Sequence, residues 1–401
     1  MDLLKLLAIF CLIIMILKFK KPLYAAILAG IAGACIAYGI DGIQAIKIMG
    51  FANVSPITVS LVLAFYTITF LQRMLEKRKQ LIRAEEALSG LFNSRRVNAM
   101  LAPFIIGLLP SAGAVIIACP IVDNAGGEYI SKEDKTFITS YFRHISEAFM
   151  PTYSSIILAL QLSGVDMTDF VLSMLPMAAV LFVMGYFFYV RKIPIETGLP
   201  NSKNKIEDMK NLFRSLWTIL FTIAIILVFK IQVHIAVCMA IFLYIIIGRF
   251  SWREMKPMFT SAFESKLIFS TVTIMMFKDI LTYAGVIDRL PETFSVLPVP
   301  TVIIFALVVL VGTIVAGASA IIAICIPLAF ASIPGGGLAL MVFLMCMIYS
   351  AMQVSPTHIC LAIVIECFET SFIDLVKRTI PVIALFILIF SGYSYALYLL
   401  Q

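Results

Sequence analysis

Charge is scarce in this sequence. Only 13% of its 401 residues are Asp, Glu, Lys or Arg, and 62% are hydrophobic. Soluble domains carry about 25% charged residues, so the composition excludes an ordinary soluble protein. Polar segments long enough to fold separately are absent, and uncharged runs able to cross about 30 Å of hydrocarbon recur throughout the chain. The sequence therefore predicts an all-α polytopic membrane protein whose surroundings are the lipid bilayer.

Several enzyme and pump motifs are also missing. There is no GxxxxGK[ST] phosphate loop, which argues against a primary pump, and no HExxH zinc motif. The eight cysteines lie in apolar segments without a CxxC pair, so we interpret them as small buried hydrophobic residues rather than metal ligands. Ser355 and His358 could meet on a helix, which keeps an intramembrane enzyme as the least favoured alternative. We expect no enzyme activity and no cofactor or metal other than Na⁺.

The placement of the basic residues predicts the topology. The net charge of +7 arises from short loops between apolar runs, which indicates membrane orientation and no nucleic-acid partner. Two charge-free runs, 97–122 and 299–330, are interrupted by Pro, Gly, Ser and Ala. If both are re-entrant hairpins, 23 of the 30 Lys and Arg residues fall in cytoplasmic loops, whereas two single spans would divide them almost evenly. The ten runs expected to cross completely are 3–17, 22–40, 55–72, 137–162, 169–190, 213–229, 232–248, 264–285, 337–365 and 379–399.

This topology places both termini on the extracytoplasmic side. Residues 3–17 lack a basic stretch before them and a small-residue cleavage site after them, so we expect a retained span rather than a signal peptide. The segment 73–96 alternates basic and apolar residues at helical spacing and is expected to lie along the cytoplasmic interface.

An internal repeat relates the two halves of the chain at an offset of roughly 205 to 210 residues. The stretch AVIIACP (114–120) matches AIIAICIP (320–327), and MPTYSSIILA (150–159) matches SPTHICLAIV (355–364). Each half contains five spans and one hairpin, and an odd number of crossings inverts one half relative to the other. We therefore expect a first inverted repeat at 1–195, a cytoplasmic linker at 196–212 and a second repeat at 213–401.

Proline and hydroxyl residues interrupt the matched spans 137–162 and 337–365. A proline inside a helix frees backbone carbonyls, and nearby hydroxyls add oxygen ligands for Na⁺ or a substrate. Small residues at the hairpin tips allow close backbone approach to a ligand. Alternatively, Pro and Thr only kink two packed helices. The residues predicted to bind substrate or ion are Ser111, Ala112, Gly113, Pro151, Thr152, Tyr153, Ser154, Ala318, Ser319, Ala320, Ser355, Pro356, Thr357 and His358.

Ionisable residues accompany both interruptions. Arg143 and Glu147 are four residues apart and can pair on one helix face, with His144 beside them. Intramembrane charge is costly and usually functional, so we predict that Arg143 attracts an anionic substrate and that Glu147 or His144 exchanges a coupling proton. Alternatively, Arg143 extends to the lipid headgroups and Glu147 neutralises it. His358, which matches Tyr153 in the repeat, suits proton coupling or substrate hydrogen bonding, with a simple packing role as the alternative.

Four stretches carry a family resemblance. GLLPSAGAVIIACPIV (107–122), FRHISEAFMPTY (142–153), GASAIIAICIPLA (317–329) and SPTHICLAIV together resemble a prokaryotic integral-membrane family of unknown function in the ion transporter superfamily. More distantly, the architecture is similar to divalent anion/sodium symporters. The resemblance implies location in the cytoplasmic membrane and a homodimer with an elevator-type fold. A scaffold would hold spans 1 to 3 and 6 to 8, and a mobile part would hold both hairpins and the other spans.

The function that the sequence favours is secondary active transport. Inverted repeats with broken helices near the membrane midplane are typical of secondary transporters. We expect the partners to be a small polar, anionic (carboxylate) metabolite and a coupling ion, Na⁺ or H⁺. A cation/proton antiporter without an organic substrate is the alternative within transport.

Overall fold

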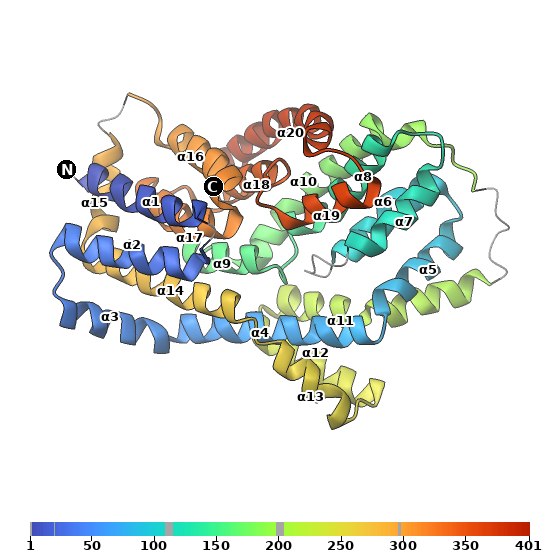
Figure 1. Cartoon of the computed structure of the whole chain (residues 1–401), viewed down its shortest axis with the longest axis horizontal. Coiled ribbons are helices and arrows are strands. Elements are labelled where there is room, and N and C mark those ends of the chain that lie inside the picture. The colour runs from blue at the N-terminus through green and yellow to red at the C-terminus, as the bar shows by residue number, and fades with distance from the viewer. Residues whose placement is uncertain (1, 20, 109–114, 198–203, 296–297) are drawn as a thin grey trace.

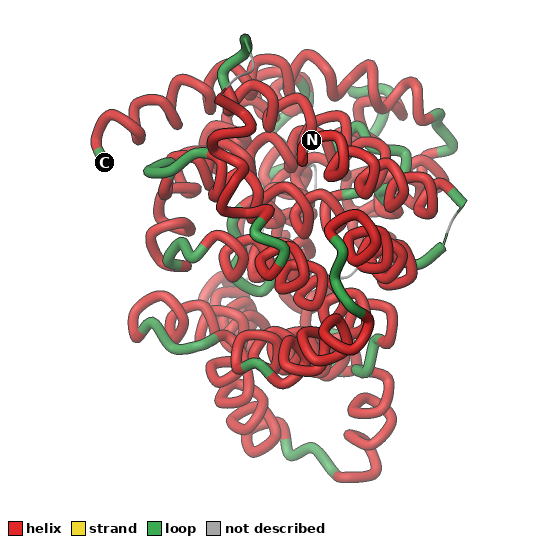
Figure 2. The backbone as a smooth tube through the Cα atoms, turned by 90° about the vertical axis from the view of Figure 1, so that its left-hand side faces the viewer, coloured by secondary structure: helices red, strands yellow, loops and turns green. Residues whose placement is uncertain are grey.

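The fold is helical wherever the structure describes the chain. The computed structural model describes residues 2–19, 21–108, 115–197, 204–295 and 298–401. Within these ranges there are twenty α-helices, two short 3₁₀ helices and no strand, joined mostly by short loops (Figure 2). One isolated β-bridge joins Ser94 and Glu196. The predicted all-α class is therefore confirmed.

The first half of the chain contains ten of these helices. They are α1 (Asp2–Lys18), α2 (Leu23–Tyr38), α3 (Gly42–Val54), α4 (Pro56–Lys77), α5 (Gln80–Phe92), α6 (Arg95–Gly107), α7 (Val115–Gly126), α8 (Lys132–Ile145), α9 (Ser154–Ser163) and α10 (Met167–Phe188). The 3₁₀ helix η2 (Ser146–Ala148) follows α8, and η3 (Val190–Lys192) follows α10.

The second half contains the other ten. They are α11 (Lys205–Phe229), α12 (Val233–Gly248), α13 (Trp252–Ser261), α14 (Ser265–Tyr283), α15 (Val286–Ser295), α16 (Thr301–Ala316), α17 (Ala318–Ser332), α18 (Gly337–Met352), α19 (Ile359–Phe368) and α20 (Phe372–Leu400). Three successive pairs, α8 and α18, α9 and α19, and α10 and α20, begin 205 residues apart.

Length and composition agree with several membrane crossings. In the described part of the chain α4, α10, α11 and α20 are long and apolar enough to cross a membrane, and further apolar helices such as α2, α12, α16 and α18 are shorter. Large apolar side chains, including Ile36, Val228 and Leu388, are exposed on these helices, as a lipid-facing surface requires. The chain is thus a multi-pass membrane protein.

Both predicted hairpins and both predicted broken helices are interrupted. The run 97–122 falls on α6 and α7, and the run 299–330 falls on α16 and α17, with the two helices of each pair packed together. The run 137–162 divides into α8 and α9, and 337–365 into α18 and α19. Each of these four runs therefore carries two helices, and each contains Pro, Gly or Ser residues, which weaken or end a helix.

One expectation about a linker is wrong, and one further helix lies between two predicted spans. Residues 196–212 are not entirely a linker, because α11 begins at Lys205, where the Asn204 side chain accepts a hydrogen bond from the backbone N–H of Glu207. Residues between the second and third predicted spans form α3, whose start Asp41 caps in the same way. Helices α3 and α11 both begin at polar cap residues, which favour helix starts. A hydropathy pattern alone therefore places these residues outside the predicted membrane spans.

The helices form two packing groups that cut across the sequence halves. One contains α6 to α10 and α16 to α20, and the other contains α1 to α5 and α11 to α14. In Figure 1 the first group includes α8, α10, α18 and α20 along the upper side, and the second includes α3, α4, α12 and α13 along the lower side. Helix α15 contacts both groups through α14 and α17.

Within the first group the halves of the sequence interlock. Helix α9 packs against α17 of the opposite half, and α19 packs against α7 and α8. Helix α9 of the first half therefore contacts the α16 and α17 pair, and α19 of the second half contacts the α6 and α7 pair. This arrangement brings the two interruptions close together.

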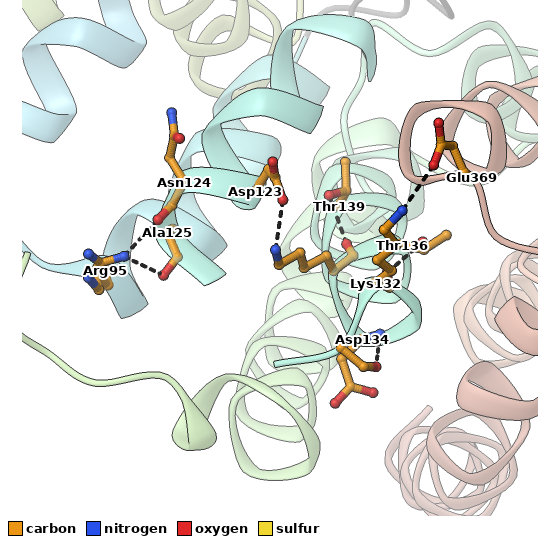
Figure 3. Close-up of polar contacts among 11 residues, drawn as sticks. Arg95, Asp123, Asn124, Ala125, Lys132, Asp134, Thr136, Thr139 and Glu369 are labelled. Carbon is orange, nitrogen blue, oxygen red and sulfur yellow. Dashed lines mark hydrogen bonds and ion pairs between the residues drawn. The ribbon is translucent and has the colours of Figure 1, made fainter. Parts of the chain in front are cut away.

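Ion pairs hold one end of this group together (Figure 3). Lys135 binds Asp123 on α7 at 2.7 Å, and Lys132 binds Glu369 after α19 at 3.0 Å. The buried carboxylate of Asp134 also pairs with Arg378 on α20 at 2.9 Å. Residues at the start of α8 thus tie it to three neighbouring elements.

Candidate functional site

The first interruption is fastened to the end of α6. After α8 the chain turns through η2 and residues 149–153 before α9 begins. The Ser146 hydroxyl donates a hydrogen bond to the Gly107 carbonyl at 2.6 Å, and the Tyr153 hydroxyl donates to the same oxygen. A Cβ atom at Gly107 would lie 2.1 Å from the backbone oxygen of Arg143, so this close approach requires glycine.

The second interruption is fastened to the end of α16 in a similar way. The Ser355 hydroxyl donates to the Ile314 carbonyl at 2.9 Å and lies 2.8 Å from the Thr357 hydroxyl. Between α16 and α17, Gly317 has φ +86° and ψ 158°, which a residue with a Cβ atom rarely adopts. Ser355 is only 1% exposed, and its hydroxyl connects the second interruption to the last turn of α16.

A cavity of about 330 Å³ lies where the two interruptions and the second hairpin meet. Eight of the predicted binding residues line it, together with Glu147. The eight are Tyr153, Ser154, Ala318, Ser319, Ala320, Ser355, Thr357 and His358. The packing of α9 against α17 thus brings the two breaks and the connection between α16 and α17 to one cavity.

Three helices begin at this cavity. Ser154 is the first residue of α9, Ala318 is the first residue of α17, and His358 is the N-cap residue of α19. The first turn of a helix has backbone N–H groups without intrahelical partners, and its dipole gives that end partial positive charge. These helix starts place backbone N–H donors at the cavity, beside the carboxylate of Glu147.

The Arg143 and Glu147 pair forms as predicted. Their nearest atoms, Arg143 Nη1 and Glu147 Oε1, lie 3.0 Å apart. The Arg143 side chain is 1% exposed, so the alternative in which it extends to the lipid headgroups is wrong. Glu147 lines the cavity, and its ion-pair partner Arg143 lies in the adjoining protein interior.

Two histidines meet beside this pair. The Nε2 atoms of His144 and His358 lie 2.8 Å apart, and His144 Nδ1 lies 2.6 Å from the Ser140 carbonyl oxygen. One ligating atom from each of His144, Glu147, His358 and Cys360 falls within a group no wider than 4.8 Å. Cys360 was missed by the sequence interpretation, and the signal that could have indicated it is its position two residues after His358.

Other predicted residues lie elsewhere. Thr152 lines a separate cavity of about 200 Å³ beside Thr69 and Gln72 of α4, and its buried hydroxyl has no partner among the described residues. Pro151 and Pro356 shape the interruptions without lining the larger cavity. Three further predicted residues, Ser111, Ala112 and Gly113, lie outside the described part of the chain.

Fold and site together define an all-helical, multi-pass membrane protein with a polar cavity between two interrupted helices. The chain belongs to the family described as "Protein of unknown function (DUF401)", whose pattern matches residues 3–396. No curated protein matches it in sequence. Among solved structures, that of the Alcanivorax borkumensis YdaH transporter is similar at 12% identity, with 90% of this chain and 89% of that chain covered and a TM-score of 0.46.

Proposed function

We propose that this protein is a secondary transporter that carries a small anionic metabolite with a carboxylate group across the cytoplasmic membrane. The observation that carries the proposal is the 330 Å³ cavity at which α9, α17 and α19 begin. Small-molecule sites usually occupy about 300 to 1,000 Å³, so the space suits a small metabolite. Helix N-termini directed at an anionic substrate are a recurring feature of transporter sites.

Recognition in this proposal combines backbone and side-chain donors. The first-turn N–H groups of α17 bind the carboxylate, and the hydroxyls of Ser154, Ser319 and Thr357 bind the polar remainder. Arg143 raises the local positive potential from behind Glu147. Because Glu147 already pairs with Arg143, its charge opposes an incoming anion less than a free carboxylate would.

Coupling to Na⁺ or H⁺ is the second part of the proposal. Carbonyls freed at the interruptions and the hydroxyl of Thr357 are suitable Na⁺ ligands, whereas Glu147, His144 and His358 are suitable proton carriers. The contact between the two histidines specifically favours the second candidate function, a cation/proton antiporter without an organic substrate.

The conformational change of transport would be a movement of one packing group relative to the other. We place the chain in the ion transporter superfamily, with two inverted repeats and with α6 to α10 and α16 to α20 as an elevator that carries the cavity. The second packing group, α1 to α5 with α11 to α14, would form the scaffold and the homodimer contact. The grouping of the helices, which contact across the two groups mainly through α5 with α6 and through α15, and the shared 205-residue offset support this mechanism.

The test is the thermal stability of the detergent-purified protein with small carboxylates, sugar acids and amino acids, each in NaCl and in choline chloride. A ligand that binds the native state raises the melting temperature by mass action. We expect a carboxylate to do so, more strongly with sodium if Na⁺ is coupled. Thr357→Val should reduce this rise, and Thr282→Val on α14, which does not line the cavity, should not.

The outcomes separate the candidates. A rise caused by a carboxylate and reduced by Thr357→Val supports the carrier. If no organic compound raises the melting temperature while Na⁺ or pH alone does, the metabolite carrier is wrong and the antiporter replaces it.

A further inference from the structure

The four residues that meet beside the cavity have the chemistry of a metal site. His144 and His358 offer imidazole nitrogens, Glu147 a carboxylate oxygen and Cys360 a sulfur, all within 4.8 Å of one another. Zn²⁺ and similar cations bind such mixed N, O and S sets tetrahedrally, with ligand atoms about 3.3 to 3.8 Å apart. Because Mg²⁺ and Ca²⁺ prefer oxygen ligands, this set selects against them.

The surroundings of His144 orient it as a ligand. Its Nδ1 atom lies 2.6 Å from the Ser140 carbonyl, an oxygen that can only accept, so Nδ1 carries the proton. The lone pair of Nε2 then points toward His358, 2.8 Å away. A backbone carbonyl that fixes the tautomer of a histidine is the usual outer contact of a metal-binding imidazole.

Glu147 is oriented in a comparable way. Arg143 Nη1 donates to Glu147 Oε1 at 3.0 Å, which leaves the second carboxylate oxygen able to bind another group. Arg143 is itself almost completely buried, does not line the cavity and holds the carboxylate through this bond.

The site is also reachable from outside the protein core. Glu147 and His358 line the 330 Å³ cavity, whereas His144 and Cys360 are buried behind them. A cation that enters the cavity meets two ligands first and completes its coordination with the other two. Since His144 and Glu147 belong to the first interruption and His358 and Cys360 to the second, the bound ion would join both.

We propose that His144, Glu147, His358 and Cys360 form a binding site for a divalent transition-metal cation of the Zn²⁺ type. Binding draws the metal between the two Nε2 atoms, moves the His358 proton to Nδ1 and releases the Cys360 thiol proton. The inference does not rest on the proposed transport function, because metal binding can be measured without a transported substrate.

Charge balance predicts a link to the anion cavity. With the thiolate and carboxylate opposing the two positive charges of the metal, the Arg143 guanidinium leaves one positive charge in excess. An anion in the adjacent cavity would compensate it, so metal and carboxylate should favour each other's binding.

The experiment uses the full chain in detergent after removal of metals with a chelator. Co²⁺ is titrated and followed by its thiolate charge-transfer band and its tetrahedral d–d bands, and Zn²⁺ is measured by displacement of Co²⁺. Cys360→Ser and His358→Gln are compared with Cys325→Ser and His234→Gln, which change the same residue types outside the cluster. Melting temperatures without metal identify variants that have lost their fold.

We expect one Co²⁺ per chain, displaced by Zn²⁺, with a charge-transfer band that disappears in Cys360→Ser. His358→Gln should weaken binding at least about tenfold, and both control variants should bind like the original protein. The proposal is overturned if the folded protein binds no stoichiometric Co²⁺ or Zn²⁺. It is also overturned if folded Cys360→Ser retains the charge-transfer band and folded His358→Gln retains the metal affinity of the original protein.

Discussion

His144 and His358 lie 214 positions apart in the chain, and their Nε2 atoms are 2.8 Å apart. Each belongs to one of the two interruptions. The contact therefore joins the two matched parts of the chain at the place where both helices are broken. Any movement of one interruption must carry the other with it or break this contact.

Replacing Gly317 should strain the second hairpin. Its φ of +86° and ψ of 158° fall in a region that is open almost exclusively to glycine, so Gly317→Ala should lower the free energy of unfolding by about 1–3 kcal/mol. Gly392→Ala is the matched control, because no atom outside its own helix lies within 4 Å of the added Cβ. Its higher helix propensity should leave stability unchanged or raise it by up to about 1 kcal/mol. Equal melting temperatures for the two variants would contradict the assigned backbone conformation.

Replacing Gly107 should separate α6 from α8. The Cβ atom of Gly107→Ala would overlap the Arg143 carbonyl oxygen at 2.1 Å, and backbone cannot move as easily as a side chain. We expect a loss of at least about 1–3 kcal/mol in the free energy of unfolding. Gly50→Ala on α3, which meets no atom within 4 Å, is the control. The close approach would be refuted if thermal unfolding of both variants matched that of the original chain.

Replacing one member of the Arg143 and Glu147 pair should lower the free energy of unfolding more than replacing both members. Arg143→Met or Glu147→Gln leaves one buried charge without its partner and should destabilise the protein by about 3–5 kcal/mol. The double variant should be more stable than the sum of the single effects predicts, as a double-mutant cycle measures. Lys132→Gln is the exposed control, because Lys132 and Glu369 are 62% and 81% exposed and their pair should leave the melting temperature almost unchanged. Additive single effects would contradict direct pairing.

Asp166, which caps the start of α10, should make the stability of the protein depend on pH in the acidic range. Burial alone would raise the pKa of Asp166, but hydrogen bonds from the backbone N–H groups of Asp169 and Thr168 and the nearby Lys230 lower it below its ordinary value. Because the pKa of Asp166 is lower in the folded state, its carboxylate contributes fully to stability above the ordinary pKa of about 3.9. This contribution is lost as the pH falls through the folded-state pKa. Asp166→Asn keeps a capping oxygen without the charge. The difference in melting temperature between the original chain and this variant should therefore shrink as the pH falls from 6 toward 3, and a constant difference would refute it.

Sequence patterns located the interruptions well. Pro151 and Pro356 stand beside two of the breaks, and Gly317 forms a third, because each residue type prevents regular helix hydrogen bonding. The Arg143 and Glu147 pair was also predictable, since residues four apart share a helix face. These are local relations that depend on spacing within a few residues.

Contacts between distant parts of the chain were beyond sequence patterns. Thr152 and Thr357 match in the repeat, yet Thr357 lines the larger cavity and Thr152 a smaller one beside α4. The repeat specifies equivalent positions, but it does not specify which neighbouring helix each position faces. That choice is made by the packing of α9 against α17 and of α19 against α7.

By itself, the sequence determined that this is an all-helical membrane protein with matched interruptions in its two halves. Apolar side chains favour the membrane because their transfer out of water is favourable. Proline interrupts a helix locally because it removes a backbone hydrogen bond. Only the tertiary structure decided that His144, Glu147, His358 and Cys360 meet beside the cavity, which Glu147 and His358 line. The physical reason is that helix packing brings together side chains from both halves, and no spacing along the chain encodes that distance.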